Sequence, residues 1–167
     1  MFNIKSLNNL NSLNNTYKSL FIFLISLFVS FLLGMLNRSP QSITMTTFDK
    51  TEAFVNIIKN NTICFLWILS GILLSKYIVY IFLTLNGLML GSLISRFANI
   101  SYMMLILPHG VTEFFAFIML SGITLNILKR KKFIKKDVSM ILFSYVILFL
   151  SAIIESTLTP YLVSNFI

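Results

Sequence analysis

The sequence is poor in charge and in the residues of common catalytic sites, and each shortage excludes a class of protein. Aspartate, glutamate, lysine and arginine make up 11% of the 167 residues, against roughly 25% in soluble domains. With 57% hydrophobic residues and a mean hydropathy of +0.89, the chain cannot hide its apolar surface in a soluble fold, because small folds leave much of their surface exposed. A soluble enzyme and a disordered tail are excluded, and a chain embedded in a lipid bilayer is predicted.

The scarcity of cysteine and histidine limits the chemistry further. One cysteine, Cys64, excludes a disulfide framework within the chain and a metal site made of cysteines. One histidine without an HExxH pattern does not make a standard catalytic zinc site. No Ser-His-Asp arrangement and no phosphate-binding glycine loop is recognisable in the sequence. We therefore expect no enzymatic activity, no cofactor and no metal.

Long uncharged runs predict the fold class: an all-α polytopic membrane protein with a bundle of about five transmembrane helices. About 20 helical residues cross a hydrocarbon core of about 30 Å. The expected spans are 19–37, 60–75, 77–95, 110–128 and 138–158. The length of the first, and the lack of a small-residue cleavage site after it, favour an uncleaved span over a signal peptide. The fourth helix should be broken or begin at Pro108-His109-Gly110, where proline suits a first turn and glycine allows a bend.

The spans form one predicted domain, residues 18–167, preceded by a tail. Residues 1–17 are rich in asparagine and are expected to form a poorly ordered or surface-lying cytoplasmic tail. The segment Phe48–Ile58 has apolar residues at helical spacing. It would form either a short amphipathic helix at the outer interface or a lead-in to the second span.

The net charge of +8 indicates the orientation of the chain in the membrane rather than nucleic-acid binding, because the basic residues lie between apolar runs. Six of the thirteen form one cluster, which should be cytoplasmic: Lys129, Arg130, Lys131, Lys132, Lys135 and Lys136. With five spans this makes the protein a multi-pass cell-membrane protein, with its N-terminus cytoplasmic and its C-terminus external. The cluster could also contact anionic lipid, or it could dock a cytoplasmic partner.

Small residues at a spacing of four predict close helix packing, because they let helix backbones approach one another in lipid. They occur in three spans: Ser26, Ser30 and Gly34; Gly71 and Ser75; Gly87, Gly91 and Ser95. We expect these stripes to pack against one another, with a partner protein as the alternative.

Polar residues within the spans mark the candidate site, because ionisable groups at membrane depth are costly and usually face protein or water. Asn86 lies in the middle of the third span, and the predicted topology puts the others near the outer leaflet: Asn60, Asn61, Arg96, His109, Glu113 and Glu155. His109 and Glu113 would share a helix face. They could form a proton-responsive pair or a structural contact that locks a helix break.

These residues carry a resemblance to a known family. The order Asn60-Asn61, Gly71, Asn86-Gly87-x-x-x-Gly91, Pro108-His109-Gly110-x-x-Glu113, then Glu155 with Thr159-Pro160 resembles the stage II sporulation protein M family over roughly residues 48–162. The Pro-His-Gly-x-x-Glu element is the most specific part.

The resemblance implies a polytopic bacterial membrane protein without known catalysis of its own. The family's namesake acts as a membrane anchor for cell-wall-degrading partners during engulfment of the forespore. Other members are small proteins of bacteriocin clusters, linked to export and self-protection beside ATP-driven transporters. The asparagine, isoleucine, lysine and phenylalanine bias resembles that of a low-GC Gram-positive chain.

Three functions are therefore expected as alternatives. The first is a non-enzymatic scaffold or anchor of a multi-protein envelope complex, with a wall-hydrolase complex as partner. The second is an accessory membrane subunit for bacteriocin export and self-immunity, with an ABC transporter as partner. The third is a small proton-coupled permease using His109 and Glu113. Each has the lipid bilayer as its surroundings, none involves nucleic acid, and self-association into a homo-oligomer stays open.

Overall fold

The chain folds into a bundle of helices. The computed structural model describes the backbone of residues 4–36, 50–96 and 100–166, and the side chains of residues 14–36, 50–96 and 110–161. Within these ranges there are five helices: α1 (Ile4–Leu36), α2 (Lys50–Ser70), α3 (Lys76–Arg96), α4 (Ile100–Arg130) and α5 (Lys135–Phe166). Each contains a segment long and apolar enough to cross a membrane. The predicted class, all-α with five spans, is confirmed.

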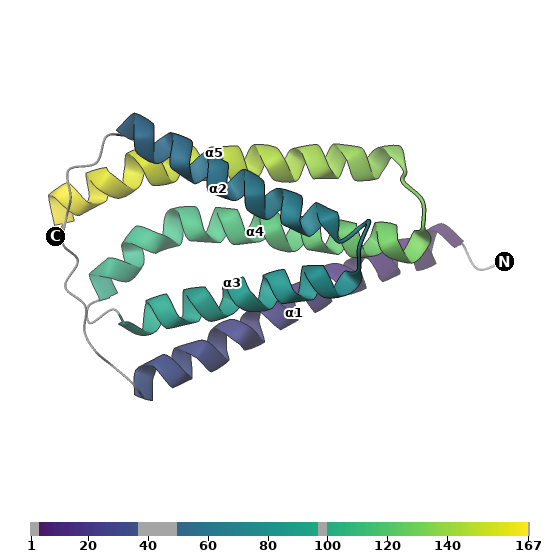
Figure 1. The fold of residues 1–167 in the computed structure, drawn as a ribbon, viewed down its shortest axis with the longest axis horizontal. Coiled ribbons are helices and arrows are strands. Elements are labelled where there is room, and N and C mark those ends of the chain that lie inside the picture. The colour runs from purple at the N-terminus through teal and green to yellow at the C-terminus, as the bar shows by residue number, and fades with distance from the viewer. Residues whose placement is uncertain (1–3, 37–49, 97–99, 167) are drawn as a thin grey trace.

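The helices surround α4, which contacts all four others. Figure 1 shows α1 beside α3 on one side of α4, with α2 and α5 on the other. The turn between α2 and α3 and the turn between α4 and α5 lie at the same end as the start of α1. We call this the basic end, because it carries Lys76 and the cluster from Lys129 to Lys136. The starts of α2 and α4 and the end of α5 lie at the opposite end.

The tightest helix pair, α1 with α3, is built on the predicted small residues. A Cβ atom added to Gly87 would lie 2.7 Å from the backbone oxygen of Phe23, and one added to Gly91 would overlap the backbone of Leu27. The Ser30 hydroxyl donates a hydrogen bond of 2.6 Å to the backbone oxygen of Leu88. The stripes on α1 and α3 therefore face each other within one chain, as expected, and they bring the two backbones into contact.

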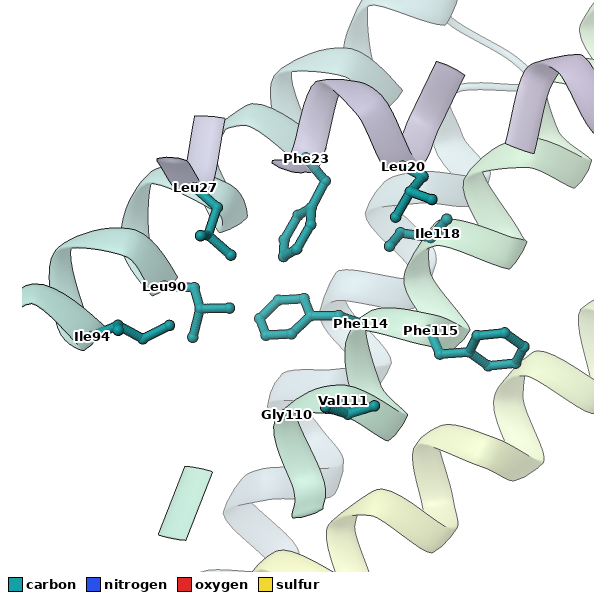
Figure 2. Close-up of a pocket in the computed structure, with 10 residues that line it drawn as sticks. All are labelled: Leu20, Phe23, Leu27, Leu90, Ile94, Gly110, Val111, Phe114, Phe115 and Ile118. Atoms are coloured by element: carbon teal, nitrogen blue, oxygen red, sulfur yellow. The ribbon is translucent and has the colours of Figure 1, made fainter. Parts of the chain in front are cut away.

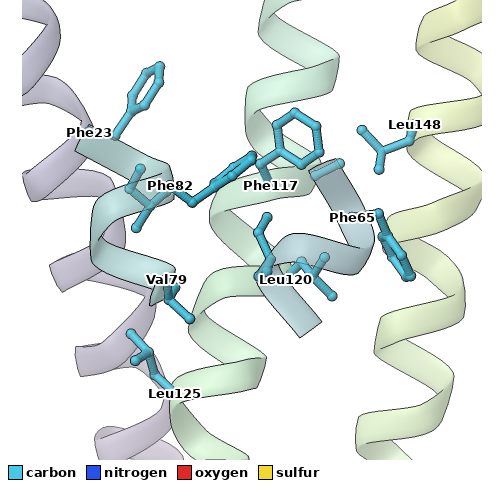
Figure 3. Close-up of a cluster of buried hydrophobic side chains, with 11 residues drawn as sticks. Phe23, Phe65, Val79, Phe82, Phe117, Leu120, Leu125 and Leu148 are labelled. Atoms are coloured by element: carbon cyan, nitrogen blue, oxygen red, sulfur yellow. The ribbon is translucent and has the colours of Figure 1, made fainter. Parts of the chain in front are cut away.

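The core is a cluster of apolar side chains to which every helix contributes (Figure 3). Its aromatic centre is Phe82 of α3 against Phe117 of α4, with ring centroids 5.2 Å apart and nearly perpendicular planes. The other labelled members are Phe23, Phe65, Val79, Leu120, Leu125 and Leu148. Such edge-to-face pairs add to the energy of close packing, so this layer ties the five helices together midway along the bundle.

The first helix starts earlier than the boundary placed at residue 17. Helix α1 begins at Ile4, so most of the asparagine-rich segment is helical and continuous with the helix of the first span; whether it lies on the membrane surface as a tail stays a prediction. Two contacts with α4 hold its later part. Asn15 donates a hydrogen bond of 2.7 Å to Asn126, and Thr16 packs against Gly122. These tertiary contacts override the weak helix propensity of asparagine.

Three other helices also differ from the sequence-based boundaries. Helix α5 runs from Lys135 to Phe166, through Pro160 and beyond the predicted end at residue 158. Helix α2 begins at Lys50 and ends at Ser70, so residues 50–58 are a lead-in to the second span and not a separate amphipathic helix; residues 37–49 lie outside the described part. Helix α4 begins at Ile100 and is helical through Pro108, so the predicted start at Pro108-His109-Gly110 falls inside the helix. Its first turns run at an angle to the rest (Figure 1). A proline within a helix removes one backbone hydrogen bond and bends it.

Candidate functional site

A polar cleft opens among four helices, α2, α3, α4 and α5, towards the end of the bundle opposite the basic end. Its volume is about 570 Å³. Six residues singled out from the sequence line it: Asn60, Asn61, Asn86, Gly110, Glu113 and Glu155. They come from helices far apart in the chain, so only the fold brings them together. Two carboxylates and several amides thus share one hollow within the membrane-spanning part of the bundle.

Helix α2 supplies the largest share of the lining through one of its faces. Asn56, Asn60 and Cys64 are spaced by four residues, and Ile57 and Asn61 form the adjacent row. Residues four apart lie one above another on a helix. The cleft side of α2 is therefore a ladder of amides that ends at the Cys64 thiol.

Asn61 stands out in this ladder because its amide is buried without a partner. The residue is 3% exposed, and its Nδ2 atom has no hydrogen-bond partner. Across the cleft, Asn86 donates from its own Nδ2 atom to the backbone oxygen of Phe82, at 2.9 Å. A buried donor left unpaired costs free energy. Because this nitrogen is itself almost inaccessible, it lies within the wall of the cleft and not on its open surface.

Among the described residues, the cleft is separate from a second hollow at the other end of the bundle. A separate hollow of about 500 Å³ at the basic end is lined by Asn15, Ser75, Lys76, Tyr80, Leu125, Leu128 and Lys129. It shares no lining residue with the cleft. The buried rings of Phe82 and Phe117 belong to the core layer between them. Among the described residues, the core layer therefore lies between the cleft and the hollow at the basic end.

Other predicted residues lie elsewhere. Gly87 and Gly91 form the contact with α1, and Gly71 packs against the Val79 side chain beside the turn from α2 to α3. Arg96 is exposed at the end of α3, and Thr159 and Pro160 are half-buried beyond Glu155. The side chains of Pro108 and His109 lie outside the described residues, so the predicted pairing of His109 with Glu113 stays a prediction.

Two polar lining residues, Asn56 and Cys64, were not predicted from the sequence to belong to the site. Their spacing of four from Asn60 is the signal that could have found them. A search for charges overlooks it, because asparagine and cysteine do not interrupt an uncharged run.

The basic cluster was predicted without its acidic partner, Asp137. Its carboxylate accepts a hydrogen bond of 2.7 Å from Arg130 and one of 3.0 Å from the backbone N–H of Ile134. Asp137 is 5% exposed. Lys131 has a left-handed φ of 51° where α4 ends. The turn is thus held in shape, and its four lysines at positions 131, 132, 135 and 136 are exposed.

The fold and the site define the class: a polytopic α-helical membrane protein with a cleft inside its bundle that several polar residues line. The chain belongs to the stage II sporulation protein M family, whose model matches residues 19–160. This confirms the resemblance carried by the polar motifs. No curated protein and no solved structure matches the chain.

Proposed function

We propose that the chain is a non-enzymatic scaffold that anchors other components of a bacterial envelope complex in the membrane. The observation that supports this role is the cleft, which shares no described lining residue with the hollow at the basic end. A pocket built by four helices and closed by an aromatic core favours holding a group over passing one across the membrane. Membership of the stage II sporulation protein M family is consistent with such a role.

The basic end is the proposed cytoplasmic docking surface of this scaffold. Lysines that only orient a helix need no fixed shape. Here a buried carboxylate, Asp137, fixes the turn through Arg130 and the N–H of Ile134. The exposed lysines around it are therefore presented in a defined geometry, which suits an acidic surface on a partner.

Purification from the native membrane after mild crosslinking tests the scaffold. We expect a reproducible set of envelope proteins, recovered above the level of an unrelated five-span membrane protein. The double variant Lys131→Gln and Lys132→Gln should reduce their recovery, whereas Lys50→Gln and Lys59→Gln, exposed elsewhere, should not. Recovery of no protein above the control would refute the scaffold. Equal recovery with both double variants would refute the docking surface alone.

The same purification decides the proposed accessory role in peptide export. The apolar groove beside the cleft (Figure 2) is a feature that a hydrophobic peptide could occupy. An ABC transporter among the recovered proteins, and a bacteriocin precursor among the neighbouring genes, would favour this role. Wall hydrolases among the recovered proteins and among the neighbouring genes would favour the role of a membrane anchor.

The proton-coupled permease is the least supported of the three roles, because the cleft ends on the core layer. It predicts that wild-type protein in liposomes shows proton-coupled flux and that Glu113→Gln abolishes it. Absence of flux in the wild type, or undiminished flux in the variant, would exclude this role.

A further inference from the structure

We propose that the hollow at the basic end binds the phosphate of an anionic phospholipid from the membrane leaflet at that end. The phosphate would lie between Lys76 of α3 and Lys129 of α4, with the first part of a hydrocarbon chain against the apolar side chains deeper in the hollow. This inference goes beyond the scaffold function and does not rest on it. It concerns the space between α1, α3 and α4, and not the lysines of the turn from α4 to α5.

Three helices that meet at the basic end border the hollow. Helix α3 begins there at Lys76, α4 ends there at Arg130, and α1 contacts both (Figure 1). The volume of the hollow, about 500 Å³, falls within the range of about 300–1,000 Å³ that is usual for small-ligand sites. The hollow is therefore large enough to receive a head group.

Contacts that do not involve the two lysines hold the walls of the hollow. In the α1 wall, Asn15 donates a hydrogen bond of 2.7 Å to Asn126 of α4. At the start of α3, the hydroxyl of Ser75 accepts a hydrogen bond of 3.3 Å from the backbone N–H of Tyr77. In the α4 wall, Leu125 belongs to the core cluster (Figure 3). The hollow is thus preformed, which lowers the entropic cost of binding.

Both charged residues that line the hollow are cationic, and they come from different helices, Lys76 from α3 and Lys129 from α4. None of the described lining residues is acidic. Asp137, the acidic residue nearest to Lys129 in the sequence, is buried and bound to Arg130 and to the N–H of Ile134. Residues 1–17 contain no aspartate or glutamate, so the α1 side brings no negative side chain. The resulting excess of positive charge suits a phosphate.

The hollow lies at the level where phospholipid head groups are expected. Lys76 is the first residue of α3 and Lys129 the second-to-last of α4. Tyr77 and Tyr80 follow Lys76, with ring centroids 6.5 Å apart, and the Lys76 Nζ atom lies 5.3 Å from the centre of the exposed Tyr77 ring. Tyrosine and lysine at the ends of membrane-spanning helices are typical of the boundary between hydrocarbon and head groups. A lipid beside these helices can therefore place its phosphate at the two lysines.

The mixed lining favours a lipid over a soluble phosphate or an acidic protein segment. Besides the two lysines and polar Asn15 and Ser75, the hollow is lined by Leu125, Leu128 and Tyr80. A soluble phosphate would leave these apolar surfaces in contact with water, whereas a hydrocarbon chain would cover them. Basic pockets between membrane-spanning helices are known to hold anionic head groups. A phosphate joined to a hydrocarbon chain therefore fits both parts of the lining.

Native mass spectrometry of the detergent-purified full chain tests the proposal. One molecule of phosphatidylglycerol per chain should bind at least about tenfold more tightly than phosphatidylethanolamine with the same chains, because the ammonium of the latter offsets its phosphate and a charge-assisted contact is worth about a factor of ten. Glycerophosphoglycerol, the same head group without chains, should not bind at the same concentration. Equal binding of the two lipids would overturn the proposal, and comparable binding of the chain-free head group would identify a site for soluble phosphates instead of lipid.

Two double variants that remove the same charge separate a site from general attraction. Lys76→Gln with Lys129→Gln should weaken phosphatidylglycerol binding at least about tenfold, to the level of phosphatidylethanolamine. Lys135→Gln with Lys136→Gln, exposed at the same end but outside the hollow, should leave it unchanged. Equal loss in both variants would show that the basic end attracts the lipid through its net charge alone. Loss in neither would show that the hollow holds no phosphate, and either result refutes the site.

Thermal melting in detergent separates lipid binding from folding. All four lysines are exposed, so both double variants should melt close to the wild type without lipid. Added phosphatidylglycerol should raise the melting temperature of the wild type and of the Lys135→Gln, Lys136→Gln protein, but not that of the Lys76→Gln, Lys129→Gln protein.

A variant that fills the hollow tests the site without changing its charge. Leu128→Trp adds bulk to the half-buried apolar lining and should weaken phosphatidylglycerol binding at least about tenfold. Leu142→Trp, exposed on α5 outside the hollow, should not. Unchanged binding by a folded Leu128→Trp protein would show that the lipid lies elsewhere. A peptide or protein that copurifies with the wild type and is lost from the Lys76→Gln, Lys129→Gln protein would identify a different occupant and refute the lipid.

Discussion

Replacing Gly91 by alanine should separate α1 from α3 and destabilise the bundle. The added Cβ atom would overlap the backbone oxygen of Leu27 and lie 2.9 Å from the backbone nitrogen of Phe31. These obstacles are backbone atoms, so no rotamer change can remove them. Ordinary contact begins at about 3.4 Å, so α1 must withdraw by at least about 0.5 Å along this row.

The expected magnitude is the difference between two opposing effects. Overpacking of a well-packed contact costs about 1–3 kcal/mol, and alanine recovers about 1 kcal/mol of helix propensity lost to glycine. The overlap at Gly91 is severe, so we expect the upper part of the overpacking range and a net loss of about 1–2 kcal/mol. For a chain of this size that lowers the melting temperature by roughly 2–8 °C.

Thermal unfolding in a mild detergent, followed by circular dichroism, measures this loss. Leu85→Ala is the matched control, because Leu85 is on the same helix but is exposed to lipid. Gly91→Leu should be more damaging than Gly91→Ala, since its side chain is larger. A Gly91→Ala protein that melts with the wild type and the control would refute the close packing of α1 on α3.

Three further predictions concern the core, the basic end and the topology. Phe117→Ala should cost about 3–5 kcal/mol, because Phe117 is almost fully buried against Phe82, and should abolish a cooperative melting transition. Asp137→Ala should cost about 1–2 kcal/mol, mostly by leaving the N–H of Ile134 without its acceptor, and should speed proteolysis at the turn from α4 to α5. A reporter fused at Lys131 should read cytoplasmic and one at the C-terminus external; the reverse would overturn the proposed orientation.

The number and the approximate positions of the spans could be predicted because charge is expensive in hydrocarbon. Gaps between charged residues therefore coincide with membrane-crossing segments. The helix ends could not be predicted in this way. Lys50, Glu52 and Lys59 lie within α2, since a helix can continue through the interface where water solvates charge. Asn15 and Thr16, which precede Lys18, belong to α1 and have partners on α4 that the sequence does not reveal.

Some of the residues that line the cleft could be predicted for a similar reason. Glu113 and Glu155 could be identified because a carboxylate is costly in hydrocarbon and usually faces protein or water. Their neighbours depend on how each helix is rotated about its axis, which the sequence does not specify. Cys64 and Asn56 became visible as lining residues only after α2 was placed beside α3 and α5. The stripes of small residues were recognisable, yet their pairing of α1 with α3, and not with α2, required the fold.

The scarce charges divide into two groups with different physical roles, one at each end of the bundle. At the basic end most of the lysines are exposed, and the buried Asp137 is paired with Arg130, so electrostatic cost is low and the surface can meet a partner. At the other end, Glu113 and Glu155 share a membrane-embedded cleft with a buried, unpaired amide. Removing an unpaired group would stabilise a purely structural bundle. Asn61→Leu should therefore leave the melting temperature in detergent unchanged or raise it, and a lower melting temperature would show that the amide contributes to folding.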